Sequence, residues 1–469
     1  MNLTRVLAFL GLEDRINSCE LQDIQIDSRQ IKAGDLFVAV PGLSTDGRDH
    51  IEQAIAKGAA AVLAEAPYTG NTHKQVHLTV IKNLKEKLPI LAAFFYRHPS
   101  SELKIIGVTG TNGKTSSTHY TAQILEANNL RCGIMGTLGN GLLSDLNATQ
   151  LTTSDCCTVQ RQLAALKQQS AKFVAMEVSS HALMQDRLVG TSFDTAVFTN
   201  LSQDHLDYHL NMQDYFNAKT RLFTEFSPKN SVINLDDPYG VKLMAMIANR
   251  NTHILCYSLN NPAADIYLDG NKLYTPWGNG ELRSPLIGRF NQSNILACIA
   301  CSGLYGLDLE QILLAIQNIS PVPGRMQKVL PHNSNLPTVI VDYAHSPDAV
   351  IKALQTLAEY KHDNLYCIIG CGGDRDRTKR PLMLKAAIEY SDRVVITMDN
   401  PRTEDPQQIV DDMLRGVEVA IPRPIIELDR AKAINDIISQ SGPNDIILIA
   451  GKGHEDYQII GTKKQPFSD

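Results

Sequence analysis

The feature that most constrains the fold is the stretch IIGVTGTNGKTSST at residues 105–118, where an apolar run meets a glycine-rich loop. The run predicts a buried strand, and the residues after Lys114 predict a helix. Glycines in the loop let backbone N–H groups approach phosphate oxygens, and the helix N-terminus adds positive potential. Lys114 is placed to reach the β- and γ-phosphates of a nucleotide, and the Thr115 hydroxyl to bind Mg²⁺. Val108 stands where the strict phosphate-loop pattern has glycine, so the motif is a variant.

Strands that alternate with helices predict an α/β fold built on a mostly parallel sheet. At roughly 150 residues per domain, 469 residues predict about three domains. Breaks rich in proline, serine and glycine lie near residue 100 and at SPVPGRMQ, residues 320–327. We therefore expect an N-terminal domain at 1–100, a central domain at 101–324 and a C-terminal domain at 325–469. The segment around 251–290 has a less regular pattern.

Composition excludes several functional classes. The formal net charge is −6 and no Lys/Arg run forms a basic footprint, which argues against nucleic-acid binding. No apolar run reaches the roughly 18 residues of a membrane span, so no membrane insertion is expected. The nine cysteines have no disulfide-framework spacing and indicate a reducing, cytoplasmic setting. The CxxC at Cys298–Cys301 lies in an apolar helical pattern that predicts two buried thiols.

Several polar residues follow strands of the central block. Glu177 ends the strand FVAMEV, where a carboxylate could hold a metal opposite the Thr115 hydroxyl. His205 and His209, four residues apart in DHLDYH, suit either a loop at a nucleotide–Mg²⁺ centre or a zinc site, for which no third ligand is obvious. Lys219 lies in an amphipathic helical pattern and by itself indicates only a solvated lysine.

The C-terminal block repeats one unit four times, an apolar strand that ends in a polar loop with glycine or proline. Parallel strands bring their carboxyl ends to one edge of a sheet, where ligands usually bind. The pattern therefore predicts that Asp342, Arg375, Arg402 and Glu455 lie near one another. Arg402, in MDNPRTEDP, could equally belong to a solvated turn with a local salt bridge.

The combination of GTNGKTSS, EVSSHAL, FTNLSQDHLDYH, YFNAKTRLF, GRFNQSN, PGRMQ, VDYAHSPDA, GCGGDRDRTKRPLM, DNPR and AGKGHEDYQ resembles the Mur ligase family. The resemblance spans nearly the whole chain. It implies a uridine-nucleotide-binding N-terminal domain, a central ATPase with a phosphate-loop sheet, and a C-terminal Rossmann-like domain. It also implies ATP and Mg²⁺ as cofactors, and ATP-dependent addition of meso-diaminopimelate to UDP-N-acetylmuramoyl-L-alanyl-D-glutamate in cytoplasmic peptidoglycan synthesis. A monomer is expected.

The resemblance also implies how the site residues divide among the ligands. The metal would be held by Thr115, Glu177, His205 and Lys219, with Lys219 carbamylated, and catalysis would rest on Lys114, Lys219, His205 and Glu177. ATP would contact Gly110, Thr111, Asn112, Gly113, Lys114, Thr115, Ser116, Asn291, Arg325, Asp342 and His345. The uridine diphosphate would contact Ser28, Leu43, Ser44 and Thr45, and the muramoyl-dipeptide Thr152, Thr153, Ser179, Gln185 and Arg187.

The amino acid would contact Arg375, Asp399, Asn400, Pro401, Arg402, Gly451 and Glu455. Arg402 is predicted to pair with the distal carboxylate of meso-diaminopimelate, which lysine lacks, because a guanidinium binds a carboxylate through two parallel hydrogen bonds. Two alternatives stay open. One is a related ligase that adds L-lysine or D-Ala-D-Ala, or a folylpolyglutamate synthase. The other is a nucleotide-dependent switch or motor that performs no ligation.

Overall fold

The computed structural model describes residues 1–12, 19–42, 45–70, 76–149, 151–329, 336–360, 363–415, 417 and 423–469. Its contacts divide the chain into two units. The first comprises Met1–Ile106, Arg131–Asp194 and Glu225–Pro228, and the second comprises Gly107–Leu130, Thr195–Thr224 and Lys229–Asp469. Strand β5 (Lys104–Thr109) begins in the first unit and ends in the second. The three-domain boundaries expected from the sequence stay a prediction.

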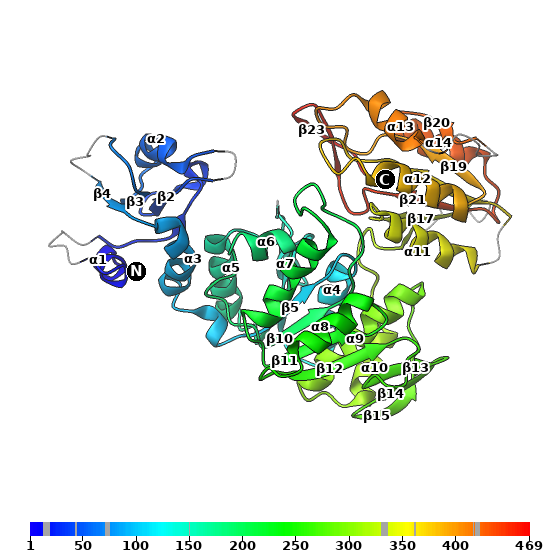
Figure 1. Ribbon diagram of the computed structural model, residues 1–469, viewed down its shortest axis with the longest axis horizontal. Coiled ribbons are helices and arrows are strands. Elements are labelled where there is room, and N and C mark those ends of the chain that lie inside the picture. Colours follow the sequence, from blue (N-terminus) through cyan, green and yellow to red (C-terminus); the bar gives the residue numbers. More distant parts are fainter. Residues whose placement is uncertain are drawn as a thin grey trace. The chain divides into compact units, whose positions relative to one another are not determined.

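The first unit holds two groups of strands (Figure 1). Four parallel strands form a sheet in the order β1 (Ile24–Gln25), β2 (Leu36–Ala39), β3 (Ala61–Glu65) and β4 (His77–Ile81). The others are β6 (Cys132–Gly136), β7 (Gly139–Leu142), β8 (Asp145–Asn147) and β9 (Phe173–Glu177). Of these, β9 and β6 pair in parallel, whereas β7 is antiparallel to both β6 and β8.

The helices of the first unit are α1 (Leu3–Phe9), α2 (Ile51–Ala56), α3 (Leu84–Phe95), α5 (Cys156–Gln168), α6 (Ser180–Met184), η1 (Ser28–Gln30), η2 (Gly47–His50) and η3 (Pro99–Ser101). Side chains of the four-stranded sheet alternate between two cores. Leu36 and Val38 of β2 pack with residues of α1 and α3, whereas Phe37 and Ala39 pack with residues of α2. This two-residue period is what a strand buried on both faces requires.

The second unit holds most of the strands after β5 (Figure 1). Its first group is β10 (Thr195–Phe198), β11 (Asn230–Asn234), β12 (His253–Ser258), β13 (Ile266–Asp269), β14 (Lys272–Thr275) and β15 (Gly278–Glu281). Strands β10 to β13 pair in parallel, and β14 is antiparallel to β13 and β15. The expectation of an irregular stretch around 251–290 is therefore wrong. Short strands joined by tight turns at residues 270–271 and 276–277 hid the alternation that marks a longer strand.

The C-terminal sheet has the order β16 (Gln327–Val329), β17 (Thr338–Asp342), β21 (Ile446–Ala450), β18 (Leu365–Ile369), β19 (Arg393–Ile396) and β20 (Ile425–Ile426). All neighbours pair in parallel except β16 with β17. A hairpin of β22 (Tyr457–Ile460) and β23 (Lys463–Pro466) follows. The helices of the second unit are α4 (Lys114–Ala127), α7 (Met212–Thr224), α8 (Pro238–Ile247), α9 (Arg289–Leu304), α10 (Leu309–Gln317), α11 (Pro347–Ala358), α12 (Lys379–Tyr390), α13 (Pro406–Leu414) and α14 (Arg430–Gln440).

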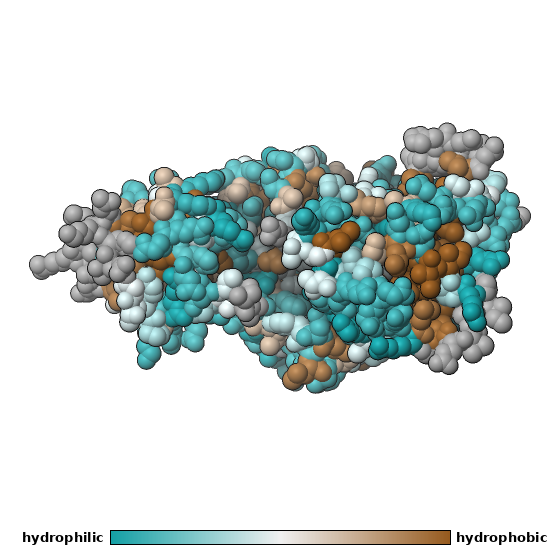
Figure 2. Space-filling model, turned by 90° about the horizontal axis from the view of Figure 1, so that it is seen from above, coloured by the Kyte–Doolittle hydropathy of each residue, from teal (hydrophilic) through white to brown (hydrophobic). Residues whose placement is uncertain are grey.

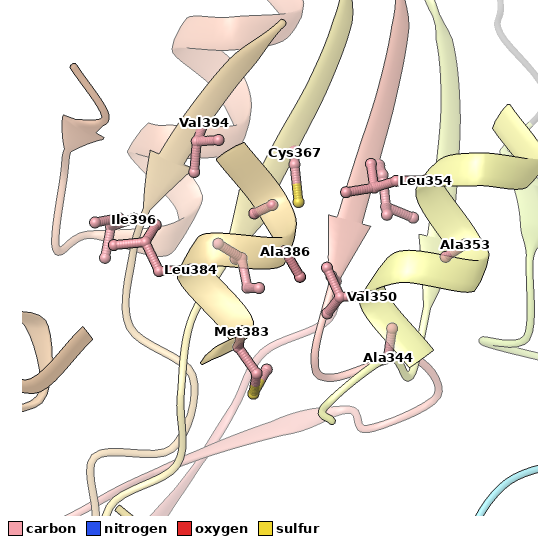
Figure 3. Packing of buried hydrophobic residues seen from close by; sticks show 14 of the residues in the cluster. Ala344, Val350, Ala353, Leu354, Cys367, Met383, Leu384, Ala386, Val394 and Ile396 are labelled. Carbon is pink, nitrogen blue, oxygen red and sulfur yellow. The ribbon is translucent and has the colours of Figure 1, made fainter. Parts of the chain in front are cut away.

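The C-terminal sheet is buried on both faces. On one face Cys367 and Ile396 pack against Val350 and Leu354 of α11 and Leu384 of α12, as Figure 3 shows. On the other face the intervening residues of the same strands pack against one side of α14: Val339, Val341, Ile368, Val395, Ile447 and Ile449. The α/β prediction with parallel sheets is confirmed. These layers leave the carboxyl ends of the strands to carry the polar loops.

Polar residues cover much of the face seen in Figure 2, with hydrophobic residues in smaller patches. Within the described part of the chain, no helix combines the length and the apolar character that crossing a membrane requires. Cys298 and Cys301 are buried in α9, as expected, and all nine cysteines are unoxidised thiols.

Candidate active site

The glycine loop between β5 and α4 bends in a way that only glycine permits. Gly110 has a φ of +152° and Gly113 a φ of +87°. A Cβ atom on Gly110 would collide with the Thr199 side chain, and one on Gly113 with the Asn294 side chain. The loop thus lies against the segment that follows β10, and the Asn112 N–H donates to Asn200 Oδ1 at 2.9 Å. Its backbone leads directly into the N-terminus of α4, the geometry that suits a phosphate group.

Two lysines converge on this loop. Lys114 Nζ donates to the carbonyl oxygens of Gly110 and Thr111, at 2.9 and 2.8 Å. Lys219 Nζ, from α7, also donates to the Gly110 carbonyl, at 2.8 Å, and lies 4.5 Å from the centre of the Tyr215 ring. Lys219 is 1% exposed, so the solvated lysine that its helix pattern suggested is wrong. The amphipathic helix turns this residue inward, toward the phosphate loop.

Burial lowers the pKa of the Lys219 amine well below its ordinary value. The Lys114 cation lowers this pKa further, whereas the Asp204 carboxylate raises it. Desolvation and a like charge both disfavour the ammonium form. Lys219 is therefore disposed to be a neutral amine, the nucleophilic form of lysine.

The loop after β10 carries Asp204 and His205. His205 has a φ of +56°, and its Nε2 lies 3.4 Å from Asp204 Oδ2. Asp204 also accepts a hydrogen bond from Lys379 Nζ at 3.2 Å and lies 3.6 Å from His345 Nε2. Burial raises the pKa of Asp204, but His345, His205 and Lys379 more than offset this and hold that pKa well below its ordinary value. A buried aspartate therefore joins this loop to His345, in the loop after β17, and to Lys379, at the start of α12.

Arg325 connects the phosphate loop to the first C-terminal strand. Its Nη2 donates to Thr115 Oγ1 at 3.1 Å, and its guanidinium stacks 4.4 Å from the centre of the Tyr343 ring. Asp342 Oδ2 accepts from the Met326 N–H at 2.6 Å. Burial raises the pKa of Asp342, and the Arg325 cation opposes this shift. Three of the expected nucleotide contacts, Thr115, Arg325 and Asp342, thus lie in one group.

Other expected nucleotide contacts lie near the same loop. Asn291 is buried near the start of α9 and accepts from Asn294, whose side chain faces Gly113. His345 Nδ1 lies 2.8 Å from the Tyr343 carbonyl oxygen, which leaves Nε2 directed at Asp204. Thr111 Oγ1 donates to the Ser202 carbonyl at 3.1 Å, and Ser116 is buried in the first turn of α4.

The C-terminal loops meet where strands β18, β19 and β21 end. Arg402 Nη1 donates to the Gly373 carbonyl at 2.7 Å, so the DNPR loop lies against the loop that carries exposed Arg375. The Arg402 backbone has a φ of +50° and exchanges hydrogen bonds with Ile459 and Gly461 at 3.0 and 2.7 Å. A left-handed arginine is rare, and such strain is concentrated at functional sites. Arg402 therefore belongs to a loop that neighbouring backbone groups hold in place. The interpretation of this stretch as a solvated turn is wrong.

Charged groups line the back of the DNPR loop. Asn400 Nδ2 donates to Glu455 Oε2 at 2.8 Å, and Lys452 Nζ donates to the same oxygen at 3.2 Å. Lys452 is fully buried and lies 3.7 Å from Asp399 Oδ1, an atom with no hydrogen-bond partner among the described residues. Burial raises the pKa of Asp399. Pro401 and Gly451 are buried beside this group.

In the first unit, a second set of expected residues gathers at the end of β9. Glu177 is 1% exposed and accepts from the Thr137 N–H and hydroxyl, at 2.8 and 3.2 Å. Thr153 Oγ1 donates to the Glu177 carbonyl at 2.8 Å and accepts from the Ser179 N–H at 3.0 Å. Arg187 Nη1 donates to the Thr153 carbonyl at 2.8 Å. Further hydrogen bonds in this set join Thr152 to Thr137 and Arg187 to Gln185.

The residues expected to meet the uridine lie elsewhere in the first unit. Ser28 is buried at the start of η1 and donates to Gln53 Oε1 at 2.7 Å. Thr45 is exposed, and its carbonyl accepts from the Gly42 N–H at 2.8 Å. Leu43 and Ser44 lie outside the described residues.

Comparison with known proteins supplies the family. Three family models match, the Mur ligase family catalytic domain at 20–96, the Mur ligase middle domain at 108–302 and the Mur ligase glutamate ligase domain at 324–453. A UDP-N-acetylmuramoyl-L-alanyl-D-glutamate–2,6-diaminopimelate ligase of Coxiella burnetii is 44% identical, over 96% of this chain and 94% of its own. A ligase of the same name from Pseudomonas putida is 45% identical, over 96% and 93%. The chain belongs to the Mur ligase family.

Solved structures agree with this assignment. One of a UDP-N-acetylmuramoyl-L-alanyl-D-glutamate–2,6-diaminopimelate ligase is 36% identical, covers 100% of this chain and 96% of its own, and has a TM-score of 0.67. Two more distant structures show the same fold alone. A UDP-N-acetylmuramoylalanyl-D-glutamyl-2,6-diaminopimelate–D-alanyl-D-alanyl ligase of Acinetobacter baumannii has a TM-score of 0.69 at 17% identity, with 96% of this chain and 95% of its own covered. A Mycobacterium tuberculosis folylpolyglutamate synthase with ADP and AMPPCP has a TM-score of 0.63 at 18%, with 78% and 92% covered.

The Mur ligase chain is therefore an ATP-dependent acid–amino-acid ligase. Sequence reasoning missed three polar residues that contact this site: Thr137 beside Glu177, Lys379 beside Asp204, and Lys452 beneath the DNPR loop. The flanking glycines of Lys452 in AGKGHE were a signal for a buried loop. Thr137 and Lys379 lie far in sequence from their partners, and no sequence signal marked either of them.

The types of side chain at the expected metal site of this Mur ligase indicate which metal ion they suit. Among the described residues, no group of three or more His, Cys, Asp or Glu side chains could hold a metal ion. The zinc alternative for His205 and His209 therefore gains no third ligand there. The hydroxyl of Thr115 and the carboxylate of Glu177 are each oxygen donors of the kind that Mg²⁺ takes, together with substrate phosphates and waters.

Proposed function

We propose that the chain catalyses the ATP-dependent addition of meso-diaminopimelate to UDP-N-acetylmuramoyl-L-alanyl-D-glutamate, giving ADP and phosphate. The observation that carries the proposal is the 44% identity, over 96% of this chain, to a ligase named for that reaction. The glycine loop with its two lysines and the DNPR loop with Arg402 supply the two halves of a site that such a reaction needs.

The chemistry explains why both halves are needed. A carboxylate does not react with an amine, because oxide would have to leave. A carboxylate oxygen of the glutamyl residue therefore attacks the γ-phosphorus of ATP, ADP leaves, and an acyl phosphate results. The amine then attacks the acyl carbon and phosphate leaves. Transfer of a phosphoryl group between anions requires alignment and neutralisation of charge rather than covalent help from the protein.

Lys114 and the loop amides are proposed to neutralise the phosphates. The ammonium of Lys114 is held by the Gly110 and Thr111 carbonyls and can exchange these contacts for phosphate oxygens. ATP is proposed to contact the loop from Gly110 to Ser116 together with Asn291, Arg325, Asp342 and His345. Arg325 supports this assignment, since its guanidinium already bonds to the Thr115 hydroxyl.

Mg²⁺ is proposed to be held by Thr115, Glu177, His205 and carbamylated Lys219, and when bound it would neutralise charge on the phosphates. The low pKa of Lys219 supports carbamylation, because only a neutral amine adds to CO₂, with loss of a proton. Carbamylation would replace a buried amine by an anion beside the Lys114 cation. The carbamate would then attract the Lys114 ammonium, which a neutral amine does not.

The remaining assignments concern the two acceptor substrates. Ser28, Leu43, Ser44 and Thr45 are proposed to contact the uridine diphosphate, and Thr152, Thr153, Ser179, Gln185 and Arg187 the muramoyl-dipeptide. Arg375, Asp399, Asn400, Pro401, Arg402, Gly451 and Glu455 are proposed to hold meso-diaminopimelate. Arg402 would meet its distal carboxylate in place of the Gly373 carbonyl. A monomer with domains at 1–100, 101–324 and 325–469, working in the cytoplasm, completes the proposal.

A phosphate-release assay with ATP, Mg²⁺, the UDP-muramoyl-dipeptide and a panel of amino acids tests the function. We expect release only when both acceptors are present, and the highest kcat/KM with meso-diaminopimelate. Preference for L-lysine or for D-Ala-D-Ala would assign a related ligase instead. ATP turnover without either acceptor would indicate a nucleotide-driven switch and overturn the proposal.

A further inference from the structure

A buried ion pair lies behind the C-terminal loops. Arg430 Nε and Nη2 donate to the two carboxylate oxygens of Asp469, at 2.6 and 2.7 Å, and both side chains are fully buried. Arg430 is the first residue of α14. Removing two charges from water costs free energy that their attraction does not reliably recover, so stability alone is a weak explanation for such a pair.

The same guanidinium also bonds to two strand ends. Arg430 Nη2 donates to the Ala450 carbonyl at 3.0 Å, and Nη1 donates to the Met398 carbonyl at 3.4 Å. Ala450 is the last residue of β21, and Met398 follows β19 by two residues. These strands are not neighbours, because β18 lies between them. Arg430 thus ties together two strand ends that no backbone ladder connects.

Each tied strand end leads directly into a loop of the amino-acid site. Asp399 to Arg402 follow Met398, and Gly451 to Glu455 follow Ala450. The loops approach closely, since a Cβ atom on Gly451 would lie 3.6 Å from Asp399 Oδ2. Besides Lys452, Arg430 is the cation that opposes the effect of burial on Asp399. A shift of one loop relative to the other would move Asp399 and Arg402 away from Glu455.

We propose that Arg430 and Asp469 are a positioning pair that sets the DNPR loop and the GKGHE loop at the separation the amino acid requires. Asp469 holds the guanidinium in the plane from which it reaches both carbonyls, and Arg430 transmits that orientation to the two loops. The pair touches no substrate. The inference deepens the proposed function, on which it rests.

The test compares Michaelis constants for the separate substrates. Asp469→Asn keeps the side-chain shape and removes its charge, and Arg430→Lys keeps the charge but cannot span the three acceptors. For both variants we expect the KM for meso-diaminopimelate to rise about tenfold or more and the KM for ATP to change less than about threefold, because small misplacements act on the ligand they position. Asp469→Glu keeps the carboxylate and should recover part of the loss.

Asp445→Asn is the matched control. Asp445 is also a buried aspartate, but it immediately precedes β21 at the amino end of that strand, where its carboxylate accepts from the Asn364 and Gly442 N–H groups. We expect this variant to lower the melting temperature and leave the KM for meso-diaminopimelate unchanged. If Asp469→Asn does not fold, Arg430→Lys and Asp469→Glu carry the comparison.

Two results would overturn the positioning role. One is an unchanged KM for the amino acid in the Asp469 and Arg430 variants, and the other is an equal rise in the control or in the KM for ATP. Failure of the proposed function is a separate result, because it appears in the wild-type enzyme as preference for another amino acid. In that case the same comparison, made with the preferred amino acid, still tests the pair.

Discussion

At the scale of single residues, the Gly110 carbonyl receives hydrogen bonds from both Lys114 and Lys219, at 2.9 and 2.8 Å. Two ammonium groups at one carbonyl would repel each other, and burial together with the Lys114 cation lowers the pKa of Lys219. The proposed roles divide in the same way, with Lys114 as the charge for phosphates and Lys219 as the amine for carbamylation. Neither role can be read from the lysine itself, because each depends on the other.

Lys219→Ala should abolish nearly all activity, because the variant has no amine to carbamylate and loses one proposed metal ligand. Millimolar short-chain carboxylates, such as acetate, should restore part of the phosphate release by occupying the position of the carbamate. Metal binding is measured alongside, by titration of the same variant. Full metal affinity together with no rescue would reduce Lys219 to a structural residue.

Arg402→Ala should remove most of the preference for meso-diaminopimelate over L-lysine by damaging the diaminopimelate reaction. With lysine in the wild-type site, Arg402 would lose its carboxylate partner, and a desolvated unpaired charge costs roughly 2–5 kcal/mol. The measurement is kcat/KM for both amino acids. A wild-type preference for lysine, or an unchanged ratio in the variant, would contradict this role.

At the scale of elements, the loop between β5 and α4 depends on backbone conformation more than on side chains. Gly113 and Gly306 share a φ of +87°, but only Gly113 faces another residue, Asn294, at the position of a Cβ atom. Substitutions at these two glycines therefore distinguish the effect of backbone strain from the effect of a steric clash. At both positions the left-handed backbone conformation disfavours any other residue to a similar extent.

Gly306→Ala should cost about 1 kcal/mol in the free energy of unfolding from left-handed strain, and Gly113→Ala should cost more because its Cβ also collides with the Asn294 side chain. Only Gly113→Ala should also raise the KM for ATP, since it pushes Asn294 away from the phosphate loop. Denaturant unfolding and steady-state kinetics on both variants make the comparison. Equal effects of the two substitutions on the KM for ATP would show that the loop tolerates a side chain.

At the scale of the whole molecule, buried imidazoles make the fold sensitive to acid. Burial lowers the pKa of His119, on α4, and of His454, in the C-terminal loop, to about 4 in each case, and the Arg325 cation contributes to both shifts. In an unfolded chain both groups titrate near 6.5. Between these values the unfolded chain binds more protons, so stability falls as the pH drops from about 6.5 to about 4.

His119→Gln should remove part of this acid sensitivity. The melting temperature of the wild type should fall between pH 7.5 and pH 5 by more than that of the variant, since glutamine cannot take up a proton in the unfolded chain. Thermal melts of both proteins at the two pH values provide the check. Parallel losses in wild type and variant would place the acid-sensitive groups elsewhere.

The sequence by itself determined the parts of this protein that local patterns encode. The strand, the glycine loop and the helix from Ile105 to Thr118 follow from residues adjacent in the chain, and so do the parallel strands that end at Asp342 and before Arg402. Parallel strands always end at the same edge of their sheet. The proximity of the loops that follow them could therefore be predicted without coordinates. The resemblance to the Mur ligases also rests on such contiguous motifs.

Only the tertiary structure decided which of these residues act on one another. The burial of Lys219, the bridge from Lys379 to Asp204 and the pairing of Arg430 with Asp469 join residues 39 to 175 positions apart. No local pattern distinguishes these charges from solvated ones. Their pKa shifts and orientations arise from desolvation and from partners that folding brings together. Composition and periodicity describe residues that are close in the sequence, whereas electrostatic effects depend on distances in space.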